Sequence, residues 1–310
     1  MLKKRAELLK KVRHFFDARG VLEVNTPLLA PAGSTDPWLD SFVTQLEGGS
    51  APCQQLYLQT SPEFYMKRLL AAGSGCIYQL GPCFRNGELS QRHNPEFFML
   101  EWYRLGWNLA ELEAECCALV DELLGAASYQ RMTYRQAFLD FVGLDPFAAS
   151  LAELRQACVE VSGIDADLLD RDGCLDLLLS HELEPALKTL ERVVLYEFPA
   201  SQAALAQIHQ DAYGNSVASR FELYINGLEL ANAYQELTSA SEQAARFAAD
   251  NAQRRALGKP EVTADIKLIA ALEKGLPDCS GIALGFDRLI MLAVGAASLD
   301  EVQTFSAYRW

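Results

Sequence analysis

Apolar residues recur at helical spacing in the first twenty positions of the chain. They are Leu8, Leu9, Val12, Phe15 and Phe16. Residues three or four positions apart share one face of a helix, and Gly20 follows where a left-handed helix cap is typical. The pattern predicts a helix over residues 2–19. The short β-branched run VLEVNTP then predicts a strand that ends at Pro27.

The segment TSPEFYMKRLLAAG predicts a second helix. Ser61 suits the N-cap, Pro62 suits the first helical position, and Gly73 suits the stop. Glu63 would then lie in the first turn.

Runs of β-branched and aromatic residues predict further strands. These strands cover residues 77–85, 96–103, 193–198 and 220–231. The segment GIALGFDRLIMLAVGA predicts a strand that leads into a helix, and the Ala- and Leu-rich pattern from about 109 to 192 predicts a helical insertion. Strands in runs, with helices grouped at the start and the middle, predict an α+β fold with a largely antiparallel sheet. We expect one domain over residues 1–310.

Composition and charge narrow the function. The formal net charge of −14 opposes a broad nucleic-acid-binding surface, because such surfaces neutralise phosphates with Lys and Arg. A local basic patch remains an alternative. The chain contains no run of 18 apolar residues and no secretion signal, so we expect a cytoplasmic protein with no membrane partner.

The eight cysteines do not form a metal-binding or disulfide pattern. They stand at positions 53, 76, 83, 116, 117, 158, 174 and 279, with no C-x-x-C pair. We expect reduced and mostly buried thiols rather than a zinc site or a disulfide framework.

The strand over residues 97–103 places a carboxylate on an apolar face. Phe97, Met99, Glu101 and Tyr103 alternate along it and therefore share one side. A buried carboxylate is costly without a partner. We therefore expect Glu101 to pair either with a cationic ligand or with an internal Arg or Lys.

The preceding loop carries the opposite charge. Arg85, Glu88, Arg92 and His93 lie in it, and guanidinium groups match phosphate oxygens in pairs. The loop predicts a phosphate site. The alternative is a polar hairpin held by ion pairs.

The segment RFELYINGLELANAYQEL predicts a hairpin with a two-residue turn at Asn226-Gly227. In that register Glu222 faces Ala231, and Glu222 and Glu229 are diagonal neighbours that begin about 7–8 Å apart. Two converging carboxylates predict a Mg²⁺ site, and the alternative is a solvated acidic face. The same register places Asn232 on the opposite side, unless a bulge or the strand end near Ala231 intervenes.

The segment GIALGFDR has one face of small residues, formed by Gly281, Ala283 and Gly285. A flat ligand can approach such a face closely. The spacing does not fit a dinucleotide or P-loop motif. Arg288 follows in the first turn of the next helix and adds a cation for a phosphate, although a surface-paired Arg is the alternative.

These segments together resemble the class II aminoacyl-tRNA synthetases, and the lysyl enzymes in particular. GVLEVNTP is similar to motif 1, FRNGELSQRHNPEFFMLEWY to motif 2 and GIALGFDR to motif 3, in the order of that family. The resemblance implies an antiparallel sheet flanked by helices. It also implies ATP as a substrate, Mg²⁺ as a cofactor and an aminoacyl-adenylate intermediate.

The resemblance also implies roles for single residues. The amino acid would be held by Ser61, Glu63, Glu101, Tyr103, Asn232, Glu236 and Ala283. ATP would be held by Arg85, Asn86, Gly87, Glu88, His93, Asn94, Phe97, Glu229, Leu230, Gly285 and Arg288. Magnesium would be held by Glu222 and Glu229. Arg85 and Arg288 would act in catalysis by relieving the repulsion between the carboxylate and the phosphates.

Two departures from the lysyl enzymes refine the expectation. No anticodon-binding barrel precedes the motif 1 helix. In this respect the chain is similar to the truncated lysyl-synthetase paralogues that attach (R)-β-lysine to a lysine of elongation factor P. Lysyl synthetases also carry Gly at the position of Ala283. We therefore expect activation of (R)-β-lysine or lysine, elongation factor P as the acceptor and no stable tRNA binding. The alternatives are a tRNA-charging fragment and a non-catalytic amino-acid-binding paralogue.

The second motif also departs from the usual Arg-x-Glu pattern. Gly87 stands where the family has a Glu that contacts adenine. Either Glu88 reaches back toward the nucleotide or ATP binding is weakened. Motif 1 pairs with its own copy in class II enzymes, so we expect a homodimer with apolar contacts from Val21, Val24 and Leu28. The alternative is an ordinary internal strand.

Overall fold

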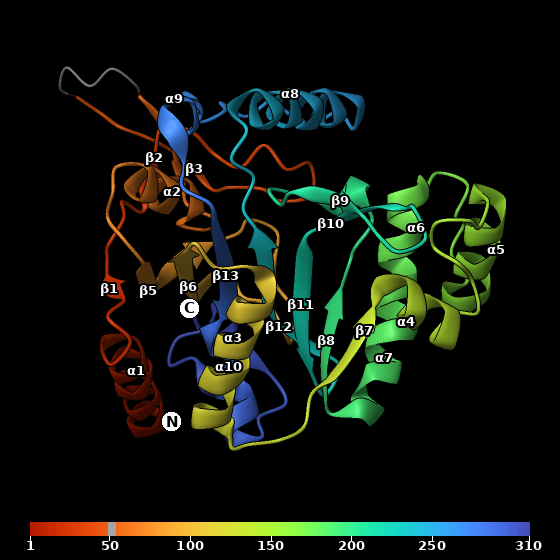
Figure 1. Cartoon of the computed structure of the whole chain (residues 1–310), viewed down its shortest axis with the longest axis horizontal. Helices are drawn as coiled ribbons and strands as arrows, with labels where there is room; N and C mark the ends of the chain where they lie inside the picture. Colours follow the sequence, from red (N-terminus) through yellow and green to blue (C-terminus); the bar gives the residue numbers. More distant parts are fainter. Residues whose placement is uncertain (49–53) are drawn as a thin grey trace. The chain divides into compact units, whose positions relative to one another are not determined.

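The computed structural model describes residues 1–48 and 54–310, so Cys53 lies outside the described residues. The described chain divides into two compact units (Figure 1). The first unit contains Met1–Trp107, Ala114–Gly125 and Leu237–Trp310, and the second contains Asn108–Glu113 and Ala126–Glu236. Compact units need not be separate domains, so the single domain over residues 1–310 stays a prediction.

The first unit begins with the predicted helix, α1 (Leu2–Asp17). Its buried face is formed by Leu8, Val12, Phe15 and Phe16. The helix ends two residues earlier than predicted, and Gly20 follows with a φ of 65°.

The predicted strand after α1 is short. Strand β1 covers only Leu22–Glu23 and pairs in parallel with β5 (Ile77–Phe84). Beyond Val24, the backbone N–H of Thr26 donates to the side chain of Gln79 instead of a strand partner. Pro27 has no N–H to donate, so the ladder cannot continue.

Three antiparallel strands carry the first unit's part of the main sheet. Strand β6 (Glu96–Leu105) lies between β5 and β13 (Cys279–Gly285), and the strand order here is β1-β5-β6-β13. The register places Gln79, Glu101 and Ala283 in one row across the sheet. The next row, on the opposite face, contains Tyr78, Trp102 and Ile282.

Helices cover the face that carries Trp102. The Phe16 ring of α1 stacks on Tyr78 with centroids 4.5 Å apart and lies 5.3 Å from Trp102. The Trp102 Nε1–H donates to Glu115 of α3 (Leu109–Leu124) at 3.1 Å. This packing explains why the alternate residues of β6 separate a structural face from the face of Glu101.

The remaining elements of the first unit are short strands and helices. A small sheet, absent from the sequence prediction, has the order β2 (Leu29–Ala30), β4 (Gln55–Leu58) and β3 (Val43–Gln45). The helices are α2 (Glu63–Ala71), α8 (Ala240–Ala256), α9 (Ile266–Gly275), α10 (Phe286–Val294), α11 (Leu299–Val302) and a 3₁₀ turn, η4 (Ala307–Arg309). Helix α2 begins one residue later than predicted, with Pro62 at the N-cap.

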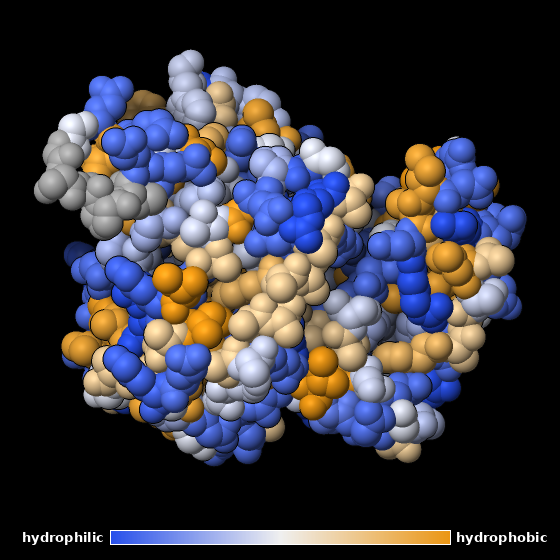
Figure 2. Space-filling view, turned by 90° about the horizontal axis from the view of Figure 1, so that it is seen from above, coloured by the Kyte–Doolittle hydropathy of each residue, from blue (hydrophilic) through white to orange (hydrophobic). Residues whose placement is uncertain are grey.

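The surface mixes polar and apolar side chains. Figure 2 shows hydrophilic residues separating small groups of apolar residues over the visible face. Across residues 1–48 and 54–310, no helix is both long enough and apolar enough to cross a membrane.

The second unit contains the predicted helix-rich region and a hairpin. Its helices are α4 (Tyr134–Phe141), α5 (Leu151–Ser162), α6 (Arg171–Leu178), η1 (Leu179–Leu183), α7 (Glu184–Leu187), η2 (Lys188–Leu190) and η3 (Ala200–Gln202). Its strands are β7 (Gln130–Thr133), β8 (Arg192–Tyr196), β9 (Ile208–Gln210), β10 (Ser216–Ala218), β11 (Arg220–Ile225) and β12 (Leu228–Gln235). The main strands follow the order β12-β11-β8-β7, and only β7 and β8 pair in parallel there.

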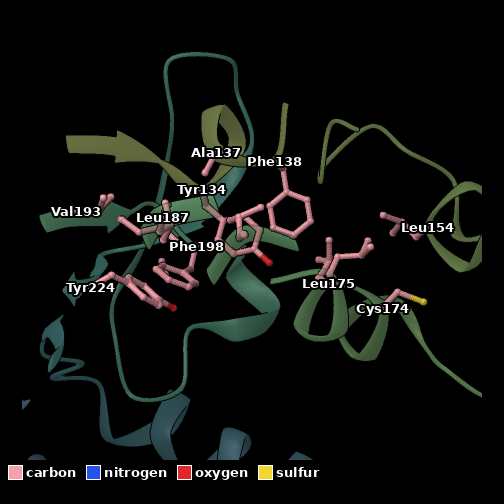
Figure 3. Close-up of a cluster of buried hydrophobic side chains, with 14 of the residues drawn as sticks. Tyr134, Ala137, Phe138, Leu154, Cys174, Leu175, Leu187, Val193, Phe198 and Tyr224 are labelled. Atoms are coloured by element: carbon pink, nitrogen blue, oxygen red, sulfur yellow. The ribbon is translucent and has the colours of Figure 1, made fainter. Parts of the chain in front are cut away.

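Aromatic side chains form the core of the second unit (Figure 3). Tyr134 stacks on Phe138 with ring centroids 4.6 Å apart and lies 4.9 Å from Phe198. Leucines from α5, α6 and α7 complete the cluster. The α+β class is therefore confirmed, with a sheet that is mainly antiparallel and has parallel pairs at β1–β5 and β7–β8.

The hairpin prediction is confirmed at its turn and wrong one residue further along. Ile225 pairs with Leu228 and Tyr224 with Glu229, as predicted. A β-bulge then shifts the register, so Glu222 pairs with Asn232 and not with Ala231. The extra residue is Leu230, and the shift returns Asn232 to the face of Glu222.

Candidate active site

Glu101 is the centre of a polar cluster in the first unit. Only 2% of the residue is exposed. Its Oε1 accepts from the Tyr103 hydroxyl at 2.7 Å, and its Oε2 accepts from the Ser61 hydroxyl at 2.8 Å. Two hydroxyl donors orient the carboxylate, and an ionised carboxylate held in this way suits an ammonium group.

Glu63 lies near this cluster and has a cation within the chain. Lys67, only 1% exposed, donates from Nζ to Glu63 Oε1 at 2.6 Å. The Ser61 hydroxyl accepts from the Glu63 N–H at 3.0 Å and thereby connects the start of α2 to Glu101. A buried lysine, which was one of the partners considered from the sequence, therefore lies in this region and pairs with Glu63. The contact of Glu63 with an amino acid stays a prediction.

Arg85 presents a buried donor that has no acceptor in the described structure. Its Nε makes no hydrogen bond, while its Nη1 lies 3.7 Å from Glu88 Oε1 and its guanidinium lies 5.1 Å from the centre of the Phe97 ring. An unsatisfied buried donor costs about 1–3 kcal/mol. The geometry therefore suits an added anion.

The turn after Arg85 explains the unusual Gly in motif 2. Gly87 has a φ of 85°, and no atom lies within 4 Å of the position that a Cβ would take. Left-handed backbone favours glycine, so the backbone conformation disfavours a side chain here although space is available. Glu88 instead lies beside Arg85. Its contact with adenine stays a prediction.

Arg288 and His93 meet beside that turn. Arg288 donates from Nη2 to His93 Nε2 at 2.8 Å. Because a guanidinium can only donate, Nε2 is the acceptor and Nδ1–H faces the Ser90 hydroxyl at 2.9 Å. A Cβ on Gly285 would lie 3.3 Å from Arg288 Cδ, so the glycine lets this side chain lie close to the strand.

The side chain of Asn94 bonds to two backbone groups of the chain. It is buried, its Nδ2 donates to the Glu96 carbonyl at 2.6 Å, and its Oδ1 accepts from the Ala307 N–H at 2.9 Å. These bonds hold the end of the motif 2 loop against the C-terminal turn. A contact of Asn94 with ATP stays a prediction.

The second unit carries the acidic face. The bulge places Glu222, Glu229 and Asn232 on one side of the hairpin. Glu222 is buried; Arg220 donates to its Oε1, and the Tyr224 hydroxyl donates to its Oε2 at 2.5 Å. Arg220 also donates from Nε to Asn232 Oδ1 at 3.1 Å.

Charge repulsion is present on this face. Burial raises the pKa of Glu222, Arg220 opposes that rise, and Glu229 adds to it. Within the described residues no group of three or more His, Cys, Asp or Glu side chains could hold a metal alone. Mg²⁺ commonly takes one or two carboxylates and completes its shell with phosphate oxygens and water. The pair of Glu222 and Glu229 fits that mode of binding.

Two further predicted residues lie in β12 or directly after it. Leu230 is the buried bulge residue. Glu236 is 1% exposed, and its carbonyl accepts from Gln207 Nε2 at 2.9 Å. Their roles toward a ligand stay predictions.

Comparison with known proteins agrees with these motifs. The family described as tRNA synthetases class II (D, K and N) matches residues 1–309. The chain belongs to this family. A Vibrio cholerae protein named elongation factor P--(R)-beta-lysine ligase is 51% identical over 98% of this chain and 94% of its own length. Proteins of the same name from Pseudoalteromonas translucida and Photorhabdus laumondii are 50% and 48% identical, each over 98% or more of this chain and 94% or more of their own length.

Within this class II synthetase chain, sequence reasoning missed Arg220. The residue orients Glu222 and Asn232 from the same face and also donates to the Gln202 carbonyl at 2.7 Å. A signal was available, because residues 220 and 222 alternate on one face of a strand and carry opposite charges. The predicted register lacked the bulge and placed Asn232 on the opposite face, so its hydrogen bond with Arg220 was not expected.

Proposed function

We propose that this chain is an ATP-dependent ligase that activates (R)-β-lysine as an aminoacyl-adenylate and transfers it to a lysine side chain of elongation factor P. The observation that carries the proposal is in the first unit. One buried carboxylate, Glu101, is held by two hydroxyls, and Arg85 offers a buried donor with no acceptor in the described structure. The names of the relatives identify the same substrate and acceptor.

The first step joins the amino acid to AMP. A carboxylate oxygen of the amino acid attacks the α-phosphorus of ATP, and the bond to pyrophosphate breaks. Glu101 would bind an ammonium group of the amino acid, while Arg85 and Arg288 would bind phosphate oxygens and stabilise the charge that develops on pyrophosphate. The chain supplies no covalent nucleophile in this scheme, and positioning of the reactants provides the rate.

The second step forms the amide. A neutral lysine amine of the acceptor attacks the carbonyl carbon of the adenylate, AMP leaves with the bonding electrons, and the amine loses a proton. An ammonium has no lone pair to attack with, so the acceptor lysine must lose its charge first.

Magnesium would be held by Glu222 and Glu229. When bound, the ion supplies positive charge to phosphate oxygens. The repulsion between the two carboxylates supports this assignment. Arg220 would keep Glu222 oriented, and Asn232 would bind the amino acid beside it.

We further propose that the protein acts without stable tRNA binding, as a homodimer in the cytoplasm. The charge of −14 disfavours a long polyanion. Elongation factor P, as a translation factor, would be met in that compartment.

The deciding experiment measures the product by mass. The protein is incubated with ATP, Mg²⁺, (R)-β-lysine, purified elongation factor P and bulk tRNA. We expect the factor to gain the mass of one β-lysyl group. Charged tRNA together with an unmodified factor would overturn the acceptor assignment.

Exchange of labelled pyrophosphate into ATP tests the first step separately. (R)-β-lysine or lysine should drive the exchange, and Glu229→Gln should lower its rate by about 100-fold or more, since one metal ligand loses its charge. Thermal unfolding serves as the control and should shift little. If no amine-bearing amino acid drives exchange at millimolar concentration, the enzyme proposal fails.

A further inference from the structure

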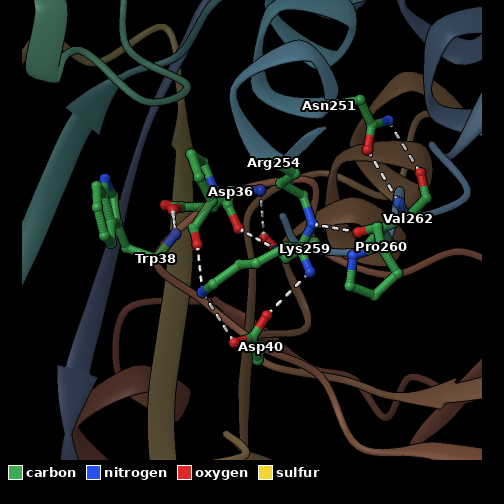
Figure 4. A network of polar contacts seen from close by, with 10 residues as sticks. Asp36, Trp38, Asp40, Asn251, Arg254, Lys259, Pro260 and Val262 are labelled. Carbon is green, nitrogen blue, oxygen red and sulfur yellow. Dashed lines mark hydrogen bonds and ion pairs between the residues drawn. The ribbon is translucent and has the colours of Figure 1, made fainter. Parts of the chain in front are cut away.

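A charged network in the first unit surrounds Asp40 (Figure 4). Arg254 Nη2 donates to Asp40 Oδ1 at 2.9 Å, and Lys259 Nζ donates to Asp40 Oδ2 at 3.0 Å. Arg254 lies in the last turn of α8, and Lys259 follows the helix. We call Asp40, Arg254 and Lys259 the Asp40 clamp. None of the three belongs to the substrate-binding residues described above.

The cations of the clamp are fixed by further bonds. Arg254 is only 3% exposed; its Nε donates to the Pro260 carbonyl and its Nη1 to the Asp36 carbonyl, each at 2.9 Å. Lys259 Nζ also donates to the Pro37 carbonyl at 2.7 Å. These bonds hold the backbone of residues 36–40 from several sides, so the clamp is a rigid support.

The carboxylate of Asp40 remains charged under ordinary conditions. Burial raises its pKa, but hydrogen bonds and charge from Lys259 and Arg254 outweigh burial and hold the pKa below its usual value. Acidification toward pH 5 therefore leaves the clamp intact.

The clamp reaches motif 2 through one backbone bond. The Asp40 carbonyl accepts from the Asn86 N–H at 2.8 Å. Asn86 lies between Arg85, whose Nε has no acceptor in the described structure, and Gly87, whose left-handed φ starts the turn. The preceding Arg85 N–H donates to the Pro95 carbonyl, on the other strand of the loop, at 2.9 Å. Asp40 thus supports the loop at the point where its two strands separate.

We infer that the Asp40 clamp is a positioning device that sets the motif 2 turn, and through it Arg85 and Glu88, for binding of ATP. The inference rests on the proposed ATP-dependent function. The clamp residues act through the Asn86 amide and do not touch the nucleotide. Loss of either cation removes one of the two bonds that fix the Asp40 carboxylate, lets the Asp40 carbonyl move and misaligns the Arg85 donor.

Amide hydrogen exchange tests the support without relying on activity. In Lys259→Gln and Asp40→Ala, exchange in a peptide that contains Asn86 should become about tenfold faster or more, because the amide loses a fixed acceptor. Arg255→Gln is the matched control: Arg255 is the next residue on α8 and pairs at 2.7 Å with Glu261, another exposed side chain. Exchange near Asn86 should not change in it.

Steady-state pyrophosphate exchange then tests the consequence. The KM for ATP should rise about tenfold in Lys259→Gln and Arg254→Gln, while the KM for (R)-β-lysine stays within about twofold of the unmodified protein. Arg254→Lys, which keeps the charge, should recover part of the loss. Lys259 is partly exposed, so its variant tests the clamp even if a change at buried Arg254 prevents folding.

The possible outcomes are distinct. Unchanged Asn86 exchange and an unchanged KM for ATP in Lys259→Gln and Asp40→Ala would overturn the clamp. Equal rises in both KM values, in proportion to lost thermal stability, would also overturn it and indicate a purely structural network. If the unmodified protein shows no amino-acid-dependent exchange of pyrophosphate, the proposed function fails instead. The hydrogen exchange result then still tests whether the Asp40 clamp holds the motif 2 turn.

Discussion

At the scale of single residues, we expect Ala283 to link the sheet to substrate choice. It pairs across the sheet with Glu101, so its methyl group projects from the same face as the carboxylate. A β-amino acid carries its amine one carbon further along the chain and can avoid that methyl. One methyl is worth about 1–3 kcal/mol in discrimination, or about 10- to 200-fold. We expect Ala283→Gly to raise the use of α-lysine by an amount in this range.

The measurement compares kcat/KM for (R)-β-lysine and α-lysine in pyrophosphate exchange. Ile282→Val is the control, because residue 282 lies on the opposite face and should affect both isomers alike. Equal use of the two isomers by the unmodified protein would rule out this explanation of specificity.

At the scale of elements, the turn of the β11–β12 hairpin, which carries Glu222 and Glu229, also packs closely against α7. Gly227 has a φ of 70°, and a Cβ there would lie 2.2 Å from the carbonyl oxygen of Glu184 in α7. Gly227→Ala therefore combines backbone strain with a clash against backbone. We expect it to lower the free energy of unfolding by about 3 kcal/mol or more, measured by urea unfolding.

Gly214→Ala provides the comparison within the same unit. Gly214 has a φ of 84° but open space around its Cβ position, so only the strain of about 1–2 kcal/mol applies. Equal losses in the two variants would show that the contact with α7 does not limit the turn.

The packing of α5 against α6 protects a thiol. Burial, followed by the neighbouring Cys174, raises the pKa of Cys158 to about 12. At pH 8 only about one Cys158 in ten thousand is then a thiolate, since the charged form appears only as the pH approaches the pKa. Iodoacetamide should label half-buried Cys117 well before Cys158 in the native protein, as peptide mass mapping would show. Rapid labelling of Cys158 at pH 8 would contradict the buried environment.

Much of this architecture was accessible from the sequence, because the signals were local. The helix of residues 2–17, the strands of motifs 2 and 3, and the Asn226-Gly227 turn follow from periodicity and turn chemistry. The bulge at Leu230 was not accessible, since only the pairing between strands reveals an extra residue. The Asp40 clamp was hidden for a similar reason: Asp40 and Arg254 lie 214 positions apart. Among the residues that the structure describes, the seven cysteines form no disulfide.

At the scale of the whole molecule, the predicted homodimer depends on motif 1. Of the residues expected at the interface, Val21 is buried within the chain, while Leu28 is 37% exposed. Leu22 is 56% exposed and offers a further apolar contact. Light scattering at micromolar concentration should give twice the 34.3 kDa of one chain, because a two-fold interface would cover these side chains.

Two variants distinguish that interface from general surface effects. Leu22→Asp should shift the mass toward the monomer, whereas Leu168→Asp, at a site that is 95% exposed in the second unit, should not. A mass of 34.3 kDa for the unmodified protein across the micromolar range would refute the dimer.

The left-handed backbone at Gly87 bears on how such ligases and lysyl synthetases diverged. A Glu introduced there would meet no steric obstacle, yet it would have to adopt a φ of 85°, at a cost of about 1–2 kcal/mol. A single codon change to Glu would therefore carry a backbone cost in addition to the new side chain. A second change that moved this turn out of the left-handed region would remove that cost, so the order of the two substitutions would decide how stable the intermediate form is.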